Sequence, residues 1–275
     1  MLSSLNCWLT WRCNFYCEYC SARKLAKHAQ GHTREASGQQ WLEALNELPA
    51  ATIDITGGEP FLHAGIYTII ARLDTKHALG ITTNLSLVNV DELPRRPNTT
   101  WTISLHFSQY NAKFDFHDFL DNAIILRDKY AQVTVNIVAT PDEMRRKNLA
   151  TLKEFFDKKG FRFHVDPDMH HKYTPYQKKK LTPYLDNDRS LNGNTRPRQC
   201  TAGTTHFHVM PDGTVFRCYY HTRPLGNLFQ ESQKYQASTL ICHVNCRSGC
   251  DLDKVEIQNV YSPKTYFLKS SCQNL

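Results

Sequence analysis

The sequence Cys13-Asn14-Phe15-Tyr16-Cys17-Glu18-Tyr19-Cys20 closely follows the first β-like segment of the chain, residues 5–9. Its three cysteines stand at Cys-x3-Cys-x2-Cys spacing. A tetrahedral zinc site needs four ligands and commonly uses paired Cys-x2-Cys units. Three thiolates instead suit a 4Fe–4S cluster whose fourth iron stays open for another ligand. We therefore take Cys13, Cys17 and Cys20 as candidate cluster ligands, with a zinc site completed by Cys7 or His28 as the alternative.

Working outward from this loop, six β-like segments rich in Val, Ile, Thr and aromatic residues alternate with helical segments. The helical segments repeat apolar residues at intervals of three and four. Such alternation predicts a parallel sheet, and six units are too few for a closed eight-stranded barrel, so we expect an open, partial barrel. The strands are expected at 5–9, 52–56, 78–84, 100–106, 133–140 and 162–165, and the helices at 37–48, 64–73, 116–130 and 141–159.

A second motif, Thr56-Gly57-Gly58-Glu59-Pro60, follows the second strand. Its glycines let the backbone approach a ligand closely, and Glu59 can accept hydrogen bonds from an ammonium group. A plain strand-to-helix turn is the alternative, because Gly-Gly and Glu-Pro favour turns. Found together, in this order and after strands one and two, the two motifs resemble the radical S-adenosylmethionine (SAM) superfamily. The resemblance covers roughly residues 3–166.

The resemblance implies an α/β fold with a partial (β/α)6 TIM-like barrel and an enzyme that binds SAM on the open iron of the 4Fe–4S cluster. An electron from the cluster splits the sulfonium bond, and the 5′-deoxyadenosyl radical removes a hydrogen atom from substrate. The resemblance places Tyr19 against the adenine and the loop of Gly57, Gly58, Glu59 and Pro60 beside the cofactor. It also implies a reductant such as flavodoxin or ferredoxin.

Other polar residues stand at the ends of the later strands, where barrel folds place their chemistry. Asn84 ends strand three, and the resemblance makes Ser104 and Asn136 candidates to contact the cofactor. His106 shares a face with Ser104 and is a candidate to face the substrate, with a simply buried histidine as the alternative. Asp166 is our candidate for the base that takes a substrate proton. Other titratable residues at or just after the end of the sixth strand are His164, Asp168 and His170, and they are further candidates for this base.

The C-terminal part of the chain is rich in cysteine and poor in helical pattern. The turn Pro211-Asp212-Gly213 between residues 206–209 and 214–218 predicts a β-hairpin. We expect three parts: a barrel over 1–166, an aperiodic bridge over 167–199, and a small hairpin domain over 200–275 stapled by bound metal.

The hairpin domain resembles the SPASM/Twitch extension of the same superfamily, which binds auxiliary 4Fe–4S clusters. Cys242-x3-Cys246-x3-Cys250 departs from the full pattern and favours the short form with one auxiliary cluster. Zinc is the alternative metal. The favoured ligands are Cys200, Cys218, Cys246 and Cys250, with Cys242 as the competitor.

The sequence defines the substrate less closely than it defines the cofactor. The first strand begins at about residue 5, so we expect no peptide-recognition domain before it and favour oxidation or rearrangement of a small biosynthetic intermediate. Modification of a ribosomally synthesised peptide, by epimerisation or cross-linking, is the alternative. A non-enzymatic metal or redox module is a third possibility, which the two intact motifs argue against.

Composition constrains the binding partners and the cellular compartment that we expect for the protein. The formal net charge of +7 could indicate nucleic acid, but a solvated basic surface is the simpler interpretation, so no nucleic-acid partner is expected. There is no signal-peptide pattern and no apolar run near the roughly 18 residues that span a membrane. We therefore expect the protein to be cytoplasmic. Because thiols stay reduced in the cytoplasm, we interpret its ten cysteines as metal ligands or catalytic groups.

Overall fold

The computed structural model describes residues 2–23, 34–141, 144, 148–185, 191, 198–200, 202–230 and 240–242. Six parallel strands form the centre of its main sheet, each paired with the next along the chain. All six predicted strands are confirmed, with bounds that differ by two residues at most. The strands are β1 (Ser4–Thr10), β2 (Thr52–Gly57), β3 (Ala78–Thr83), β4 (Thr99–Ser104), β5 (Gln132–Ala139) and β6 (Arg162–Pro167).

The predicted hairpin is also present, as β8 (His206–Val209) and β9 (Thr214–Phe216), which pair antiparallel. Gly213 supplies the turn with a φ of 83°, a conformation that glycine adopts without steric cost. A further strand, β10 (Pro224–Asn227), pairs with β9. The hairpin extends the barrel's own sheet, because β8 pairs parallel with β1. The sheet therefore has nine strands and stays open, in the order β10-β9-β8-β1-β2-β3-β4-β5-β6.

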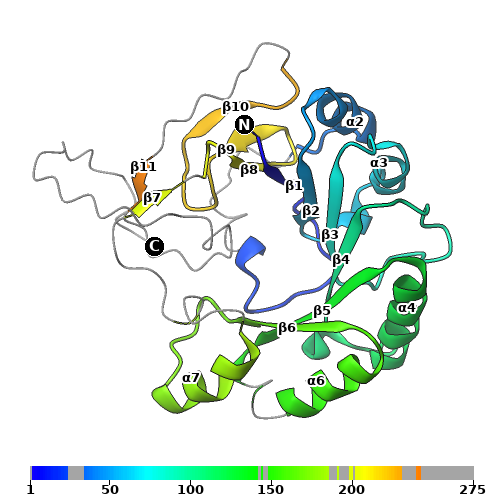
Figure 1. Cartoon of the computed structure of the whole chain (residues 1–275), viewed down its shortest axis with the longest axis vertical. Helices are drawn as coiled ribbons and strands as arrows, with labels where there is room; N and C mark the ends of the chain where they lie inside the picture. Colours follow the sequence, from blue (N-terminus) through cyan, green and yellow to red (C-terminus); the bar gives the residue numbers. More distant parts are fainter. Residues whose placement is uncertain are drawn as a thin grey trace, which may run out of the picture.

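Helices cover the outer side of the curved sheet (Figure 1). They are α2 (Gly38–Glu47), α3 (Ile66–Arg72), α4 (Phe116–Lys129) and α6 (Leu149–Lys158). Short 3-10 turns, η1 (Pro60–Leu62) and η2 (Phe107–Gln109), follow β2 and β4. The connection from β3 to β4 has no helix.

Side-chain caps explain where these helices begin. Ser37 and Gln40 form a capping box at the start of α2, which satisfies amide groups that a helix end leaves without partners. The fourth helix was expected to run without a break from Pro141 to residue 159. Pro141 and Met144 are helical, as expected, but Asn148 is not, and α6 begins separately at Leu149. The Asn148 side chain caps it by accepting hydrogen bonds from two backbone amides of its first turn, so α6 has a start of its own.

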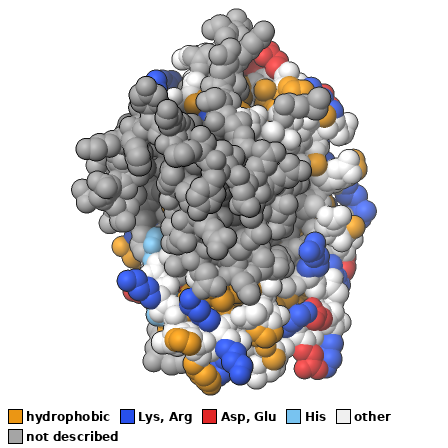
Figure 2. Space-filling model, turned by 60° about the vertical axis from the view of Figure 1, so that its left-hand side comes forward, with side chains coloured by type: hydrophobic (Ala, Val, Ile, Leu, Met, Phe, Trp, Pro, Cys, Tyr) orange, Lys and Arg blue, Asp and Glu red, His pale blue; other side chains and the backbone are white. Residues whose placement is uncertain are grey.

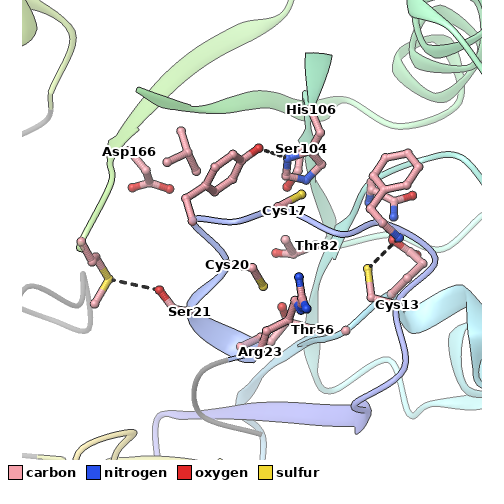
Figure 3. Close-up of a pocket in the computed structure, with 18 of the residues that line it drawn as sticks. Cys13, Cys17, Cys20, Ser21, Arg23, Thr56, Thr82, Ser104, His106 and Asp166 are labelled. Carbon is pink, nitrogen blue, oxygen red and sulfur yellow. Dashed lines mark hydrogen bonds between the residues drawn. The ribbon is translucent and has the colours of Figure 1, made fainter. Parts of the chain in front are cut away.

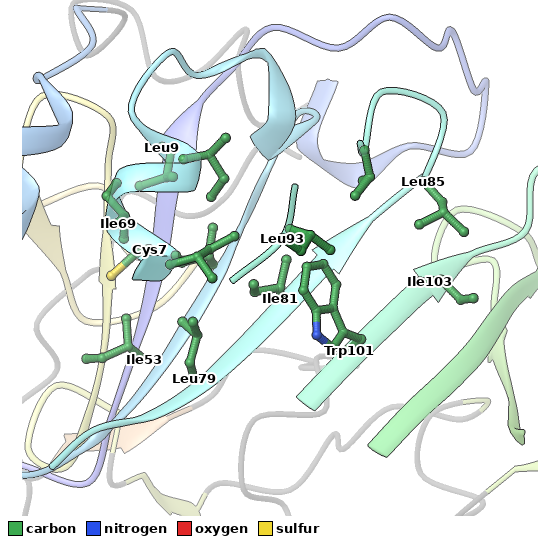
Figure 4. Packing of buried hydrophobic residues seen from close by; sticks show 14 of the residues in the cluster. Cys7, Leu9, Ile53, Ile69, Leu79, Ile81, Leu85, Leu93, Trp101 and Ile103 are labelled. Atoms are coloured by element: carbon green, nitrogen blue, oxygen red, sulfur yellow. The ribbon is translucent and has the colours of Figure 1, made fainter. Parts of the chain in front are cut away.

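The core lies between the sheet and the helices (Figure 4). Alternate residues of β1 face it, and Cys7 is completely buried there beside β2 and α3. Trp41 of α2 and Trp101 of β4 are among the largest buried side chains. Burying side chains of this kind contributes about 1.5–3 kcal/mol each relative to exposure. Cys7 therefore packs as a small buried hydrophobic side chain.

The segment expected to be an aperiodic bridge contains a helix that the sequence pattern did not reveal. This helix, α7 (Pro175–Leu181), has Pro175 at its first position and a capping box between Thr174 and Gln177. It is followed by η3 (Thr182–Tyr184). Over seven residues α7 buries mainly Leu181, so it shows no apolar period, and only its capping residues could have predicted it.

Two further strands, β7 (Arg198–Cys200) and β11 (Leu240–Cys242), form a separate antiparallel pair. On the described part of the face in Figure 2, Lys and Arg side chains lie apart from one another, with acidic side chains among them. No helix in the described residues is long and apolar enough to cross a membrane.

Candidate active site

A cavity of about 600 Å³ opens at the carboxyl ends of the parallel strands. The ends of β2, β3, β4, β5 and β6 all contribute to its wall, together with the loop that follows β1 (Figure 3). Cys13, Cys17 and Cys20 all line it. The cysteine loop and the strand ends thus enclose one space, as the partial-barrel prediction requires.

The three cysteines differ in their surroundings. Cys13 is exposed and accepts a 3.4 Å hydrogen bond from the Phe15 amide. Burial raises the pKa of the Cys17 thiol to about 12, while the nearby Tyr19 side chain acts in the opposite direction. Negative charge on Cys20 or Cys13 would raise the pKa of Cys17 further. The three thiols are therefore close enough to repel one another as thiolates, and bound iron would remove that repulsion.

This donor set fits an iron–sulfur cluster. Among the described residues, no group of three or more His, Cys, Asp and Glu side chains is arranged to hold a single metal ion. A multi-iron cluster separates its thiolate ligands more widely than one ion does. Cys7 faces the core instead of the cavity, so it is not placed to complete a zinc site, and His28 lies outside the described residues.

The Gly-Gly-Glu-Pro loop packs directly on the cysteine loop. The Gly58 amide donates to the Thr10 carbonyl and the Glu59 amide to the Arg12 carbonyl, both at 2.8 Å. Gly57 has a φ of +122°, and a Cβ on Gly58 would lie 2.0 Å from the Arg12 oxygen. The glycines are thus required where two backbones meet, in addition to any approach to a ligand.

Glu59 lines the cavity but is 1% exposed. Its Oε1 accepts from the Thr83 hydroxyl at 2.7 Å, and its Oε2 from the Asn84 amide at 2.7 Å. Burial raises the pKa of Glu59 to about 6, against the effect of these hydrogen bonds. The Asn84 side chain in turn donates to Asn14 Oδ1 at 2.9 Å. Glu59 and Asn84 therefore join the second motif to β3 and to the cysteine loop.

His106 follows β4 and contacts the cysteine loop. Its Nδ1 lies 2.7 Å from the Tyr19 hydroxyl, a hydrogen bond drawn in Figure 3. The Phe15 ring packs edge-on against the imidazole, with centroids 5.9 Å apart. Burial lowers the pKa of His106 to about 4, so the ring is neutral near pH 7.

Asp166 also lines the cavity, near the end of β6 (Figure 3). Asn136 Nδ2 donates to Asp166 Oδ2 at 2.9 Å, and His164 Nε2 lies 3.3 Å from Oδ1. The Asn136 Oδ1 is buried and has no partner among the described residues. Asp168 also lines the cavity, but its Oδ1 accepts from the His170 amide at 2.9 Å.

The structure brings most of the predicted site residues together. Three of the predicted residues do not line the cavity: Pro60, Asn136 and Cys218. Cys246 and Cys250 fall outside the described residues, and of Cys200 and Cys242 only the backbone is described. The predicted residues that do line the cavity are Cys13, Cys17, Tyr19, Cys20, Gly57, Gly58, Glu59, Asn84, Ser104, His106 and Asp166.

Several lining residues were not singled out from the sequence. Met169 accepts a weak contact from the Ser21 hydroxyl at 3.8 Å, which joins the end of the cysteine loop to the segment after β6. Arg23 lies over the Tyr16 ring at 3.0 Å. In the sequence, Met169 and Arg23 are marked as possible site residues only by their closeness to the predicted sixth strand and to the cysteine motif. Further lining residues of this kind are Trp11, Phe15 and Leu185.

Comparison with known proteins agrees with this geometry. The solved structure "Native anSMEcpe with bound AdoMet" is similar in fold, with a TM-score of 0.59, 19% identity, and coverage of 84% of this chain and 79% of that one. "Native anSMEcpe with bound AdoMet and Cp18Cys peptide" gives a TM-score of 0.57, 17% identity, and coverage of 83% and 78%. The search of curated proteins gave no significant match.

A family model supplies the assignment. The model described as "Radical SAM superfamily" matches residues 9–155, a segment that contains both motifs and most of the parallel strands. Membership of that family implies an enzyme that binds SAM and a 4Fe–4S cluster. The chain belongs to the radical SAM superfamily.

Proposed function

We propose that this enzyme cleaves SAM reductively at the cavity and uses the resulting 5′-deoxyadenosyl radical to take a hydrogen atom from its substrate. The observation that carries this proposal is that Cys13, Cys17 and Cys20 line the same cavity as the Gly-Gly-Glu-Pro loop. Bound cluster and SAM would supply the electron and the radical. The chain's own residues would supply the three thiolates, bury Glu59 beside them, and present Asp166 to the same cavity.

We further propose that the reaction is a net two-electron oxidation. Loss of a hydrogen atom leaves a carbon radical on the substrate, and removal of one more electron and one proton completes the oxidation. Asp166 Oδ1 or Oδ2 receives that proton. Asn136 and His164 support the carboxylate in position, and its exposure to the cavity lets the proton leave afterwards.

An auxiliary 4Fe–4S cluster is the proposed acceptor of the second electron. The register of β7 and β11 supports a cysteine site here, because Cys200 pairs with Leu240 and Cys242 with Arg198. Cys200 and Cys242 therefore occupy neighbouring strands two positions apart in register. This favours Cys242 more than the sequence alone did, beside Cys218, Cys246 and Cys250.

The proposed substrate is a small biosynthetic intermediate, because titratable groups such as Asp166 and His164 gather on one wall of a cavity of limited volume. Peptide modification is the second candidate. It is favoured by the fold similarity to anSMEcpe, one structure of which holds a peptide together with AdoMet.

The test is anaerobic incubation of the reconstituted, dithionite-reduced protein with SAM. We expect 5′-deoxyadenosine from the wild type and none from Cys17→Ala, with Cys7→Ala as the control because Cys7 lies in the core. A deuterated panel of small molecules and short peptides then identifies the substrate by label in 5′-deoxyadenosine. An intact cluster that yields no 5′-deoxyadenosine would overturn the proposal.

A further inference from the structure

We propose that His106 is a positioning residue that holds the cysteine loop against the end of β4 through a hydrogen bond to Tyr19. The inference rests on the proposed function, since it assigns a role to a residue beside the cluster ligands. The effect of the hydrogen bond is to keep Cys17 and Cys20 in place, both before and after the cluster binds. This role differs from the substrate-facing one that the position of His106 in the sequence predicts.

The hydrogen bond joins two distant parts of the chain. The Tyr19 hydroxyl lies 2.7 Å from His106 Nδ1, and Figure 3 draws this contact. Tyr19 stands between Cys17 and Cys20 in the sequence, and His106 follows β4 at a separation of 87 positions. A hydroxyl can donate or accept, so the contact forms with either tautomer of the imidazole. It therefore ties the half of the loop that carries two of the three cysteines to a strand of the barrel.

Aromatic packing holds the imidazole in place. Phe15 and Tyr19 flank Cys17 in the sequence, and both rings contact the ring of His106, at centroid distances of 5.9 and 6.0 Å. Phe15 and Cys17 are 8% and 7% exposed. A hydrogen bond that forms out of water is electrostatically stronger than one in solvent. His106 thus fills the space between the two rings on either side of a buried cluster ligand.

The connection from β4 to α4 supports the same half of the loop at two more points. The Gln109 Oε1 accepts a 2.7 Å hydrogen bond from the Tyr16 amide. The Phe114 ring packs against the Phe15 ring, with centroids 6.5 Å apart. The first half of the loop has a different support, since Asn14 accepts from a side chain that directly follows β3. The cysteine loop is therefore held between the ends of two neighbouring strands.

This support should control how often the loop opens. Residues that contact metal ligands orient them, and a site on a loop is precise only when its surroundings hold it. Because Cys17 is 7% exposed, a reagent reaches its sulfur only when the loop opens locally. Loss of the bond between Tyr19 and His106 should raise the population of the open loop about fivefold, the effect expected of one neutral hydrogen bond.

Alkylation of Cys17 in the full-length apoprotein measures this opening. Tyr19→Phe and His106→Phe each remove the hydrogen bond and keep an aromatic ring. N-ethylmaleimide, followed anaerobically by peptide mass spectrometry, should label Cys17 about five times faster in each variant than in the wild type. The double variant should be no faster than the single ones, because both remove the same bond. Wild-type rates in the single variants, or effects that multiply in the double variant, contradict the inference, and either single variant decides if the other does not fold.

Two further variants separate positioning from a general loss of stability. Tyr16→Phe changes another tyrosine of the same loop, which is 70% exposed. Tyr130→Phe removes a hydrogen bond of the same kind, because the Tyr130 hydroxyl donates to the Pro94 carbonyl. Tyr130 is 4% exposed and precedes β5, at the end of the strand opposite the cavity. Both variants should show the wild-type rate at Cys17. Labelling in Tyr130→Phe as fast as in Tyr19→Phe would mean that only global stability is involved.

Release of iron gives a second readout that needs the cluster but no turnover. A chelator should remove iron from the reconstituted protein about five times faster in Tyr19→Phe and His106→Phe than in the wild type or Tyr130→Phe. A wild type that holds its cluster but fails to cleave SAM refutes the proposed function. An active wild type whose loop variants match Tyr130→Phe in both assays refutes only this inference.

Discussion

A β-carbon on Gly58 would lie 2.0 Å from the carbonyl oxygen of Arg12. The two motifs of this enzyme therefore meet through their backbones, and the amides of Gly58 and Glu59 donate to the carbonyls of Thr10 and Arg12. The position of the cysteine loop depends on this contact, because the loop starts directly after Arg12.

Gly58→Ala should consequently disturb the cluster site. The new methyl group meets backbone, which cannot rotate away, so we expect a loss of about 1–3 kcal/mol of stability and incomplete cluster assembly. Denaturant unfolding of the apoprotein and iron content after reconstitution measure the two effects.

Gly160→Ala is the control for this prediction. Gly160 has a φ of +79°, and an added β-carbon would meet no clash, since its nearest neighbour, Arg127 Cδ, would lie at an ordinary contact distance of 3.7 Å. It precedes β6, at the end of the strand opposite the cavity. The variant should lose a comparable amount of stability, about 1 kcal/mol, and keep full iron content. Full iron content in Gly58→Ala as well would contradict the importance of the backbone contact.

Asp166→Asn should separate SAM cleavage from substrate oxidation. The variant keeps the shape of the side chain but removes the proton acceptor, so product formation should fall by about 10²–10⁴-fold, while 5′-deoxyadenosine still forms. Asp168→Asn is the comparison, because its carboxylate is engaged by the His170 amide and the loss should be below about tenfold. Liquid chromatography of 5′-deoxyadenosine and product measures both. The reverse ranking of the two variants would exclude Asp166 as the base.

His106 should make the apoprotein sensitive to acid. Burial lowers its pKa from 6.5 to about 4, so the unfolded chain binds this proton first as the pH falls. Its contribution is fully present above pH 6.5 and is lost as the pH falls toward 4. The full shift in the pKa of His106 corresponds to about 3 kcal/mol of unfolding free energy. The side chain is only partly buried, so screening by water in the cavity makes the effect smaller.

The measurement is denaturant unfolding of wild type and His106→Asn between pH 4 and 7. Glu59, whose pKa is raised to about 6, acts in the opposite direction, but it is present in both proteins and cancels in the difference. The wild type should lose stability relative to His106→Asn as the pH falls. Parallel pH profiles would mean that the histidine titrates normally.

Iron content tests the auxiliary cluster. The wild type should bind about eight iron atoms per chain and Cys218→Ala about four, because each 4Fe–4S cluster holds four. Cys272→Ala is the control, since this cysteine is not a predicted ligand. Elemental analysis distinguishes the alternatives: one zinc per chain, or four iron atoms in the wild type, rules out the second cluster.

Much of this architecture was predictable from local pattern. Strand positions, the hairpin turn and the cysteine spacing depend on residues close together in sequence, and β1–β6 appear where their β-branched and aromatic content predicts. Elements without a period were missed, as α7 shows, because seven residues with one buried side chain carry no helical signal. The helix expected over 141–159 is not continuous, because Asn148 is not helical and caps the separate start of α6.

The sequence by itself determined the family, the partial barrel and the three cysteines, because spacing along the chain is what a cluster loop requires. Tertiary structure decided how those cysteines are held. Gly58 meets Arg12, Tyr19 meets His106 across 87 positions, and β8 joins the barrel sheet beside β1. Contacts between such distant positions leave no periodic trace in the sequence, since they arise only when strands from opposite parts of the chain pack together.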